Sequence, residues 1–226
     1  MRLPIYALAL TLVAGVPHGT FDERPEIQAA QQVRVVYEHS TLQGICTLVD
    51  VEPHPGGFSL SFITSARLFK SDRGEPFMPA TEVRVIMEDG VELSVPREYR
   101  YLPIGDFSDI AVLRADVAAN ALVPASMGFS PPPPGRAIDI VAFDRDGLRR
   151  IQTQHVRFMS TRFMVGDRDL STFADCLGAP VIDGDEVVGV VSDCEPGRSA
   201  LVTPLSVAFS FLSRHIPGLT GRPTSR

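Results

Sequence analysis

The chain has 226 residues, of which 44% are hydrophobic and 21% are charged, as in an ordinary globular protein. Its formal net charge of -6 disfavours nucleic acids and anionic membrane surfaces as partners. Nineteen prolines and eighteen glycines lie among short apolar runs, a pattern that favours many strands and turns over long helices.

The start of the chain has the pattern of a signal peptide. A single arginine, Arg2, precedes an apolar run from Ile5 to Val16, which has the length of a signal-peptide core and is too short to span a bilayer comfortably. The alternative is an uncleaved segment that lies near a membrane or is buried. We therefore expect an extracytoplasmic protein, periplasmic or secreted, with residues 1–19 as signal peptide and 20–32 as a polar linker.

Residues 33–121 are predicted to form a first β-barrel. Short apolar runs alternate there with turn signals, and the Asp-Gly pair at Asp89-Gly90 favours a hairpin. The run from Pro53 to Gly57 is predicted to be a loop. The predicted strands are Val33–Tyr37, Gly44–Val49, Phe58–Ile63, the two arms of the 83–95 hairpin, and 107–113.

Residues 137–216 are predicted to form a second barrel and a terminal helix, followed by a tail at 217–226. Four consecutive prolines make residues 122–136 a stiff, extended connector between the two barrels. Thr203 is predicted to be the N-cap of the helix, with Pro204 at its first position. The predicted apolar face of this helix is Leu205, Ala208, Phe209 and Leu212. The predicted strands are 137–143, 152–159, 162–165, 181–182 and 187–191.

Three short motifs lie along these two halves. They are Thr64-Ser65-Ala66-Arg67-Leu68, Asp109-Ile110-Ala111-Val112-Leu113 and Asp175-Cys176-Leu177-Gly178-Ala179-Pro180. In this order they resemble the signatures of the chymotrypsin/trypsin-like serine protease family (peptidase S1), over residues 33–216. The resemblance implies an all-β fold of two six-stranded antiparallel barrels with a C-terminal helix, and a Ser-His-Asp triad in the cleft between them.

The same alignment implies that two of the three catalytic side chains are missing. When the sequence is aligned to the family at Pro180, Leu177 takes the place of the nucleophilic serine. Leucine has no nucleophilic atom. Either Arg67 or Leu68 takes the place of the histidine, and neither can accept a proton at neutral pH. Only Asp109 is retained. If Arg67 holds the histidine position, we expect a structural ion pair between Arg67 and Asp109.

The loop before Pro180 departs from the family in two further places. Asp175 stands where a glycine normally helps to form the oxyanion site, and its carboxylate would repel developing negative charge. Cys176 replaces a buried aspartate. The three cysteines leave an odd one over, and in an exported protein we expect a Cys176–Cys194 disulfide, with buried free thiols as the alternative. The cysteine and histidine spacing does not fit a zinc site, and we expect no metal and no cofactor.

The favoured interpretation is an exported, catalytically inactive protease homologue that acts as a binding or regulatory module. Its ligand would be a peptide or protein held in the former cleft, near Asp175, Cys176, Gly178 and Ser192. Two alternatives are an active peptidase with a displaced nucleophile, Cys176 or Ser192, and a purely structural domain. Fold alone does not decide among these three.

Overall fold

The computed structural model describes residues 25–70, 80–103, 108–119, 122–144, 147–166, 176–195 and 199–219. The expected signal peptide, residues 20–24 of the expected linker, Asp175 and residues 220–226 of the tail lie outside these ranges.

The first half of the chain forms a seven-stranded sheet in the order β5-β4-β1-β2-β3-β7-β6. All its neighbouring strands are antiparallel. The side chains on the inner face of this sheet form one half of the core, as is typical of an antiparallel sheet whose other face is exposed to solvent. The strands are β1 (Ala30–Val36), β2 (Thr41–His54), β3 (Gly57–Ser65), β4 (Glu82–Ile86), β5 (Glu92–Ser94), β6 (Arg100–Tyr101) and β7 (Ile110–Val117).

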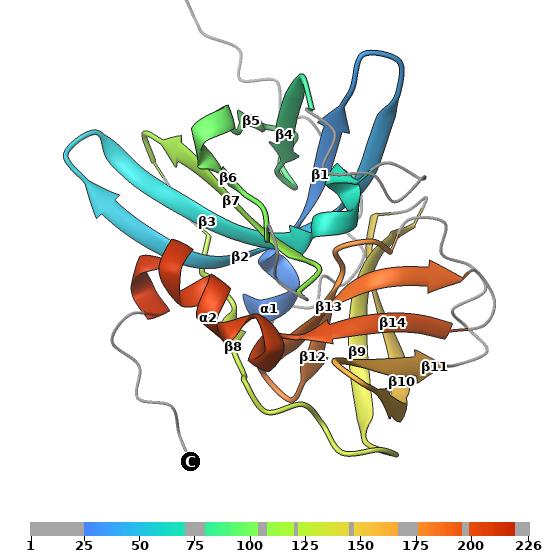
Figure 1. Ribbon diagram of the computed structural model, residues 1–226. Helices are drawn as coiled ribbons and strands as arrows, with labels where there is room; N and C mark the ends of the chain where they lie inside the picture. Colours follow the sequence, from blue (N-terminus) through green and yellow to red (C-terminus); the bar gives the residue numbers. More distant parts are fainter. Residues whose placement is uncertain are drawn as a thin grey trace, which may run out of the picture.

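The second half forms a sheet in the order β12-β9-β10-β11-β14-β13-β8, which an additional β12–β13 pairing closes into a six-stranded barrel. Figure 1 shows this barrel in yellow to red beside the first sheet in blue to green. The short strand β8 pairs in parallel with β13 outside the closed ring. The strands are β8 (Ser126–Met127), β9 (Ala137–Asp144), β10 (Gly147–Met159), β11 (Arg162–Gly166), β12 (Pro180–Asp183), β13 (Glu186–Glu195) and β14 (Ser199–Pro204).

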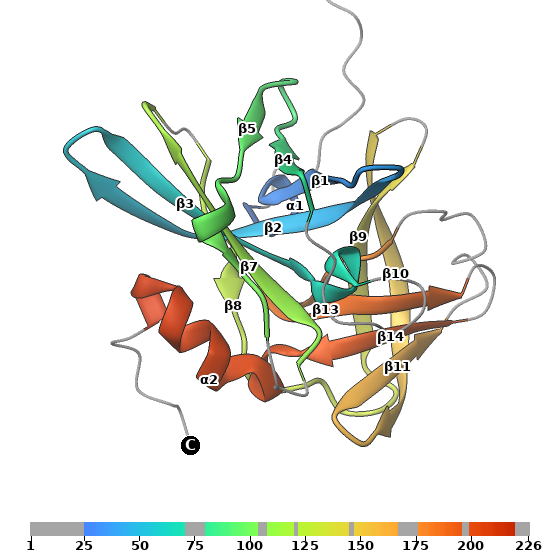
Figure 2. The same cartoon turned by 45° about the horizontal axis from the view of Figure 1, so that its top comes forward.

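The terminal helix α2 (Leu205–His215) returns from the second barrel to the first (Figure 2). Its buried face is Leu205, Ala208, Phe211 and Leu212. At its end the ring of His215 stacks on Tyr101 of β6, with centroids 4.4 Å apart. In the following 3₁₀ helix η4 (Pro217–Leu219), the Gly218 N–H donates to Asp50 of β2 at 3.2 Å. These contacts join the C-terminus to the N-terminal half of the molecule.

The predicted all-β, two-barrel, trypsin-like fold with a C-terminal helix is therefore confirmed. One detail differs, because hydrogen bonding between described strands closes only the second barrel into a ring. The first sheet ends at β5 on one side and at β6 on the other.

Several local predictions need correction. Residues 25–32, assigned to a linker, form the one-turn helix α1 (Pro25–Gln28) and the start of β1, because Ile27, Ala29 and Ala30 supply buried apolar surface. The predicted loop at 53–57 is mostly strand, since β2 runs to His54 and β3 starts at Gly57.

The entry to the terminal helix also differs from the prediction. Strand β14 lies where no strand was predicted, and Thr203 belongs to this strand, paired with Val190. Pro204 is the N-cap and makes no side-chain capping hydrogen bond. Phe211, not Phe209, completes the buried face, while Phe209 packs edge-on against Phe129. No helix in the described ranges is long and apolar enough to cross a membrane.

Candidate binding cleft

The three motifs meet where the two barrels face each other. The 3₁₀ helix η1 (Ala66–Phe69) is bonded to the second motif, because the Ala66 N–H donates to the Asp109 carbonyl at 2.6 Å. The loop at 176–179 crosses to the first barrel, where the Ile45 N–H donates to the Leu177 carbonyl at 2.8 Å. The backbone thus brings together the positions that the resemblance assigns to a triad.

Asp109 is buried in this cleft between two cations. Its side chain is only 5% exposed. One carboxylate oxygen accepts from the Lys70 ammonium at 2.7 Å, and the other accepts from the Arg162 guanidinium. Lys70 follows η1 in the first half of the chain, whereas Arg162 begins β11 in the second barrel. Both carboxylate oxygens are therefore engaged by positive charge in an environment with little water.

Arg67 pairs with a different carboxylate, so the predicted Arg67–Asp109 pair is wrong. The Arg67 guanidinium lies 2.6 Å from Asp193 Oδ2 on β13. In η1 the Ser65 hydroxyl caps the Arg67 N–H, and the Lys70 N–H bonds back to the Arg67 carbonyl. Residues three apart in a 3₁₀ turn share a face. Arg67 and Lys70 therefore both point to the cleft, where Lys70 reaches Asp109 and Arg67 reaches across to the second barrel.

Leu68, the other candidate for the histidine position, is fully buried. Its carbonyl accepts a hydrogen bond from the buried Tyr37 hydroxyl. A Cβ built on Gly44 would lie 2.7 Å from a Leu68 methyl carbon, so the leucine packs closely against the backbone of β2. Of the two candidates, Arg67 is the one that faces the cleft.

We define the cleft charge cluster as Arg67, Lys70, Asp109, Arg162 and Asp193. It contains three cations and two carboxylates, a net charge of +1 on a chain whose formal charge is -6. Two of its ion pairs, Arg67–Asp193 and Arg162–Asp109, join one half of the molecule to the other. Lys70, Arg162 and Asp193 lie outside the three motifs and were not predicted. Only the three-residue spacing from Arg67 to Lys70 offered a signal for one of them.

The loop at the former serine position is held against β2 by its backbone. Gly178 has φ +85°, a conformation that favours glycine, and its N–H donates to the Val191 carbonyl at 2.9 Å. A Cβ at this position would clash with the Ile45 carbonyl oxygen and the Thr64 hydroxyl. The partly buried Leu177 precedes this glycine.

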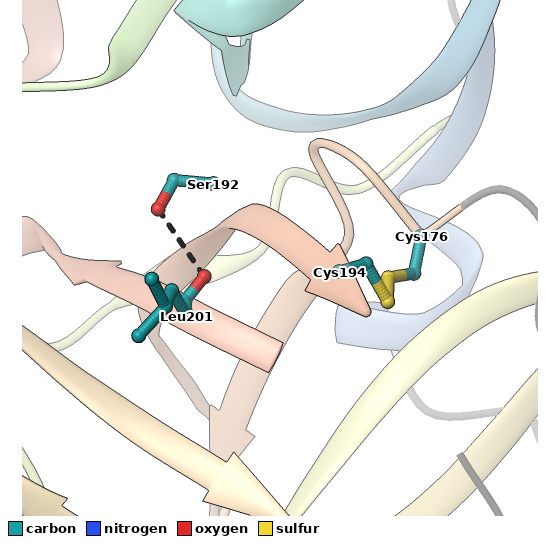
Figure 3. Close-up of a disulfide and its surroundings, with 4 residues drawn as sticks. All are labelled: Cys176, Ser192, Cys194 and Leu201. Atoms are coloured by element: carbon teal, nitrogen blue, oxygen red, sulfur yellow. Dashed lines mark hydrogen bonds between the residues drawn. A yellow bond between two sulfur atoms is a disulfide. The ribbon is translucent and has the colours of Figure 1, made fainter. Parts of the chain in front are cut away.

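The structure joins Cys176 and Cys194 in a disulfide that ties this loop to the end of β13 (Figure 3). Their Cα atoms are 6.3 Å apart, within the usual range. Ser192 is fully buried, and its hydroxyl donates to the Leu201 carbonyl at 3.2 Å. The remaining cysteine, Cys46, is buried, and burial raises the pKa of its thiol. The sulfur of Cys176 and the hydroxyl of Ser192, both proposed as displaced nucleophiles, are thus engaged in other bonds.

None of the four histidines in the described ranges contacts the Asp109 carboxylate, and each contacts another group instead. The contacts are His39 with Glu38 at 3.9 Å, His54 with Asp116 at 3.8 Å, His155 with the Pro132 carbonyl at 2.6 Å, and His215 with Tyr101. Among the described residues, therefore, the Asp109 carboxylate is bonded to two cations and to no histidine.

A pocket of about 180 Å³ opens beside the cleft charge cluster. Met159, Met164 and Leu201 supply its apolar wall. Arg157, Ser199 and Asp193 supply its polar wall, and Asp193 is the residue that also binds Arg67. No group of three metal-ligating side chains occurs in the described part of the chain.

Solved structures with the same fold are trypsin-like serine proteases. An inactivated protease paralogue from the scabies mite is 15% identical, with TM-score 0.62, over 84% of this chain and 94% of that one. An active-form protease from M. tuberculosis is 13% identical, with TM-score 0.61, over 94% and 93%. A serine endoprotease from Yersinia pestis is 13% identical, with TM-score 0.60, over 85% of this chain and 64% of its own. No protein-family model matches the sequence, and no curated protein matches it. At these identities the likeness concerns the fold.

Proposed function

We propose that this protein is a catalytically inactive homologue of trypsin-like proteases that binds a peptide or protein segment in the former catalytic cleft. The observation that carries the proposal is the pairing of the buried Asp109 carboxylate with Lys70 and Arg162. In a working triad that carboxylate orients a histidine, which takes the proton from the nucleophile.

The groups that replace the triad cannot perform acyl transfer. Leu177 has no atom that attacks a carbonyl carbon. Arg67 carries a guanidinium, which is not deprotonated in proteins, and it is paired with Asp193. A general base must accept a proton from the nucleophile, and a guanidinium has no acceptor. Leu177 and Arg67, the residues at the serine and histidine positions, therefore supply neither partner of the proton-transfer step.

Two features support peptide binding in this cleft. The first is a strand edge on β13. Its pairing with β12 ends at Val190, and the 178–179 loop bonds to both backbone groups of Val191. From Asp193 to Glu195, β13 pairs within the described ranges with β14 alone. An extended peptide can add to such an edge through backbone hydrogen bonds. The second is the adjacent pocket, into which a side chain of that peptide can project. A purely structural domain would have no need of either feature.

The proposal includes export to an oxidising compartment. The Cys176–Cys194 disulfide supports it, because disulfides persist outside the cytosol, and so does the signal-peptide pattern of residues 1–19. Cell fractionation with N-terminal sequencing of the mature protein tests this part. A cytosolic protein that retains Met1 would contradict it.

The test of the function is retention of a random octapeptide pool by the full-length protein, with mass spectrometry of the peptides afterwards. We expect a subset of peptides to be retained intact. Met164→Trp, which fills the pocket, should weaken retention, while Val91→Trp at an exposed site of the first barrel should not. Cleaved peptides would favour a displaced nucleophile, and no retention at all would favour a structural domain.

A further inference from the structure

We propose that the pocket beside Asp193 selects a peptide segment in which an apolar side chain stands next to an acidic one, and that Arg157 is the selecting residue. This inference rests on the proposed peptide-binding function and assigns the chemical class of the ligand.

The size of the pocket suits one side chain. Its volume is about 180 Å³, whereas pockets for whole drug-sized ligands are typically ~300–1,000 Å³. An apolar cavity of roughly 150 Å³ holds one benzene-sized group. Met159, Met164 and Leu201 would contact that group. Methionine side chains adapt to ligands of different shape, so these walls fit a leucine-, methionine- or phenylalanine-sized group without selecting strictly among them.

The charge of the pocket selects the neighbouring residue. Of its two charged side chains, Asp193 is already bound to Arg67 at 2.6 Å. Arg157 is exposed and has no acidic partner among the residues that the structure describes. Among the described side chains, the pocket therefore offers one cation without an acidic partner and one carboxylate that is already paired. An acidic side chain gains an ion pair there, whereas a basic one is repelled by Arg157 and would have to displace Arg67 from Asp193.

The surroundings of the pocket add to its positive charge. Of the exposed apolar residues at the end of β10, Met159 is 42% exposed and lines the pocket, whereas Phe158 packs against His155 and Phe163. The cleft charge cluster, whose Arg162 pairs with Met159 across the β10–β11 turn, contributes its net charge of +1. On a chain of net charge -6, this is a local reversal of sign that would attract an acidic segment.

The experiment uses three fluorescein-labelled octapeptide pools with a fixed central pair, Glu-Leu, Gln-Leu or Lys-Leu, each an equal mixture of the two orders. Fluorescence anisotropy with the full-length protein gives an apparent Kd for each pool. We expect the Glu-Leu pool to bind about tenfold more tightly than the Lys-Leu pool, with the Gln-Leu pool between them. The preference should shrink at high salt, because exposed charges are screened.

Arg157→Glu should reverse the order of the Glu-Leu and Lys-Leu pools. The matched control is Arg97→Ala, which removes an exposed arginine from η2 (Arg97–Tyr99) of the first barrel and should leave the order unchanged. Equal binding of all three pools to the wild-type protein would overturn the inference and leave the proposed function standing. No binding by any pool would count against both. A preference that survives Arg157→Glu would overturn the role of Arg157.

Discussion

Two clusters of cationic side chains and carboxylates in this molecule differ mainly in where they lie. On the surface of the first barrel, Arg84 of β4 bridges Glu82 and Glu92, and Arg34 of β1 also reaches Glu92. The two carboxylates are 38% and 34% exposed, and all four residues belong to neighbouring strands of one sheet. The cleft charge cluster, in contrast, joins the two halves of the molecule around a carboxylate that is 5% exposed.

The difference teaches that burial, and not the number of ion pairs, decides what such a cluster contributes. Exposed pairs contribute little, because water and salt screen them. A buried carboxylate that loses its cations keeps its desolvation cost without compensation. The short contacts of Arg84 raise the pKa of its guanidinium and lower the pKa of Glu92 through side-chain hydrogen bonds, yet both side chains stay in contact with solvent.

The largest effect should follow from removing both cations of Asp109. We expect Lys70→Met with Arg162→Met to lower the free energy of unfolding by about 3 kcal/mol, the low end for breaking a buried pair, because both cations are partly exposed. Chemical denaturation at pH 7 measures it. Adding Asp109→Asn should restore most of the loss, since an amide carries no charge. Failure of this rescue would mean that the two side chains act through packing alone.

A smaller difference should separate Lys70 from Arg67. Lys70→Met alone leaves Asp109 with one cation and should cost about 1–2 kcal/mol. Arg67→Met leaves the half-exposed Asp193, and should cost less than about 1 kcal/mol. This order is the reverse of the one that an Arg67–Asp109 pair would give. A larger loss for Arg67→Met, measured under the same conditions, would contradict the assignment of partners.

Acidification should weaken the contact between α2 and the first barrel. Burial, with Arg214 nearby, lowers the pKa of His215. The unfolded chain therefore binds more protons than the folded protein, and stability falls as pH decreases below the unfolded value of about 6.5. We expect the Tm to drop more between pH 7.5 and pH 5 in the wild type than in His215→Phe, which keeps the stacking on Tyr101. Equal drops would contradict this.

The smallest effect should follow from breaking the surface cluster. Glu92→Gln removes the carboxylate shared by Arg34 and Arg84, and we expect no measurable change in Tm at 150 mM salt. A drop as large as that of Lys70→Met would remove the distinction between the two clusters.

Much of the fold followed from the sequence because three ordered motifs specify one architecture. The candidate site followed only in part. Positions 67, 109 and 177 were assigned from motifs, but the partners of Asp109 come from a residue just past a 3₁₀ turn and from the first residue of β11. No local pattern encodes the meeting of Lys70 with Arg162, because it depends on how two barrels pack. The same is true of Thr203. Its local sequence predicts a helix N-cap, but in the structure it pairs with Val190 of β13, because tertiary contacts override local propensity.

The central claim, that the cleft has lost acyl-transfer chemistry, is tested most directly by peptide hydrolysis with a fluorogenic peptide library. The wild-type protein and Leu177→Ser, which restores only the hydroxyl, are compared with buffer alone. We predict that neither hydrolyses the library faster than buffer, because no proton acceptor stands beside Asp109 among the described residues. Turnover by the wild type, or its appearance in Leu177→Ser, would contradict the account.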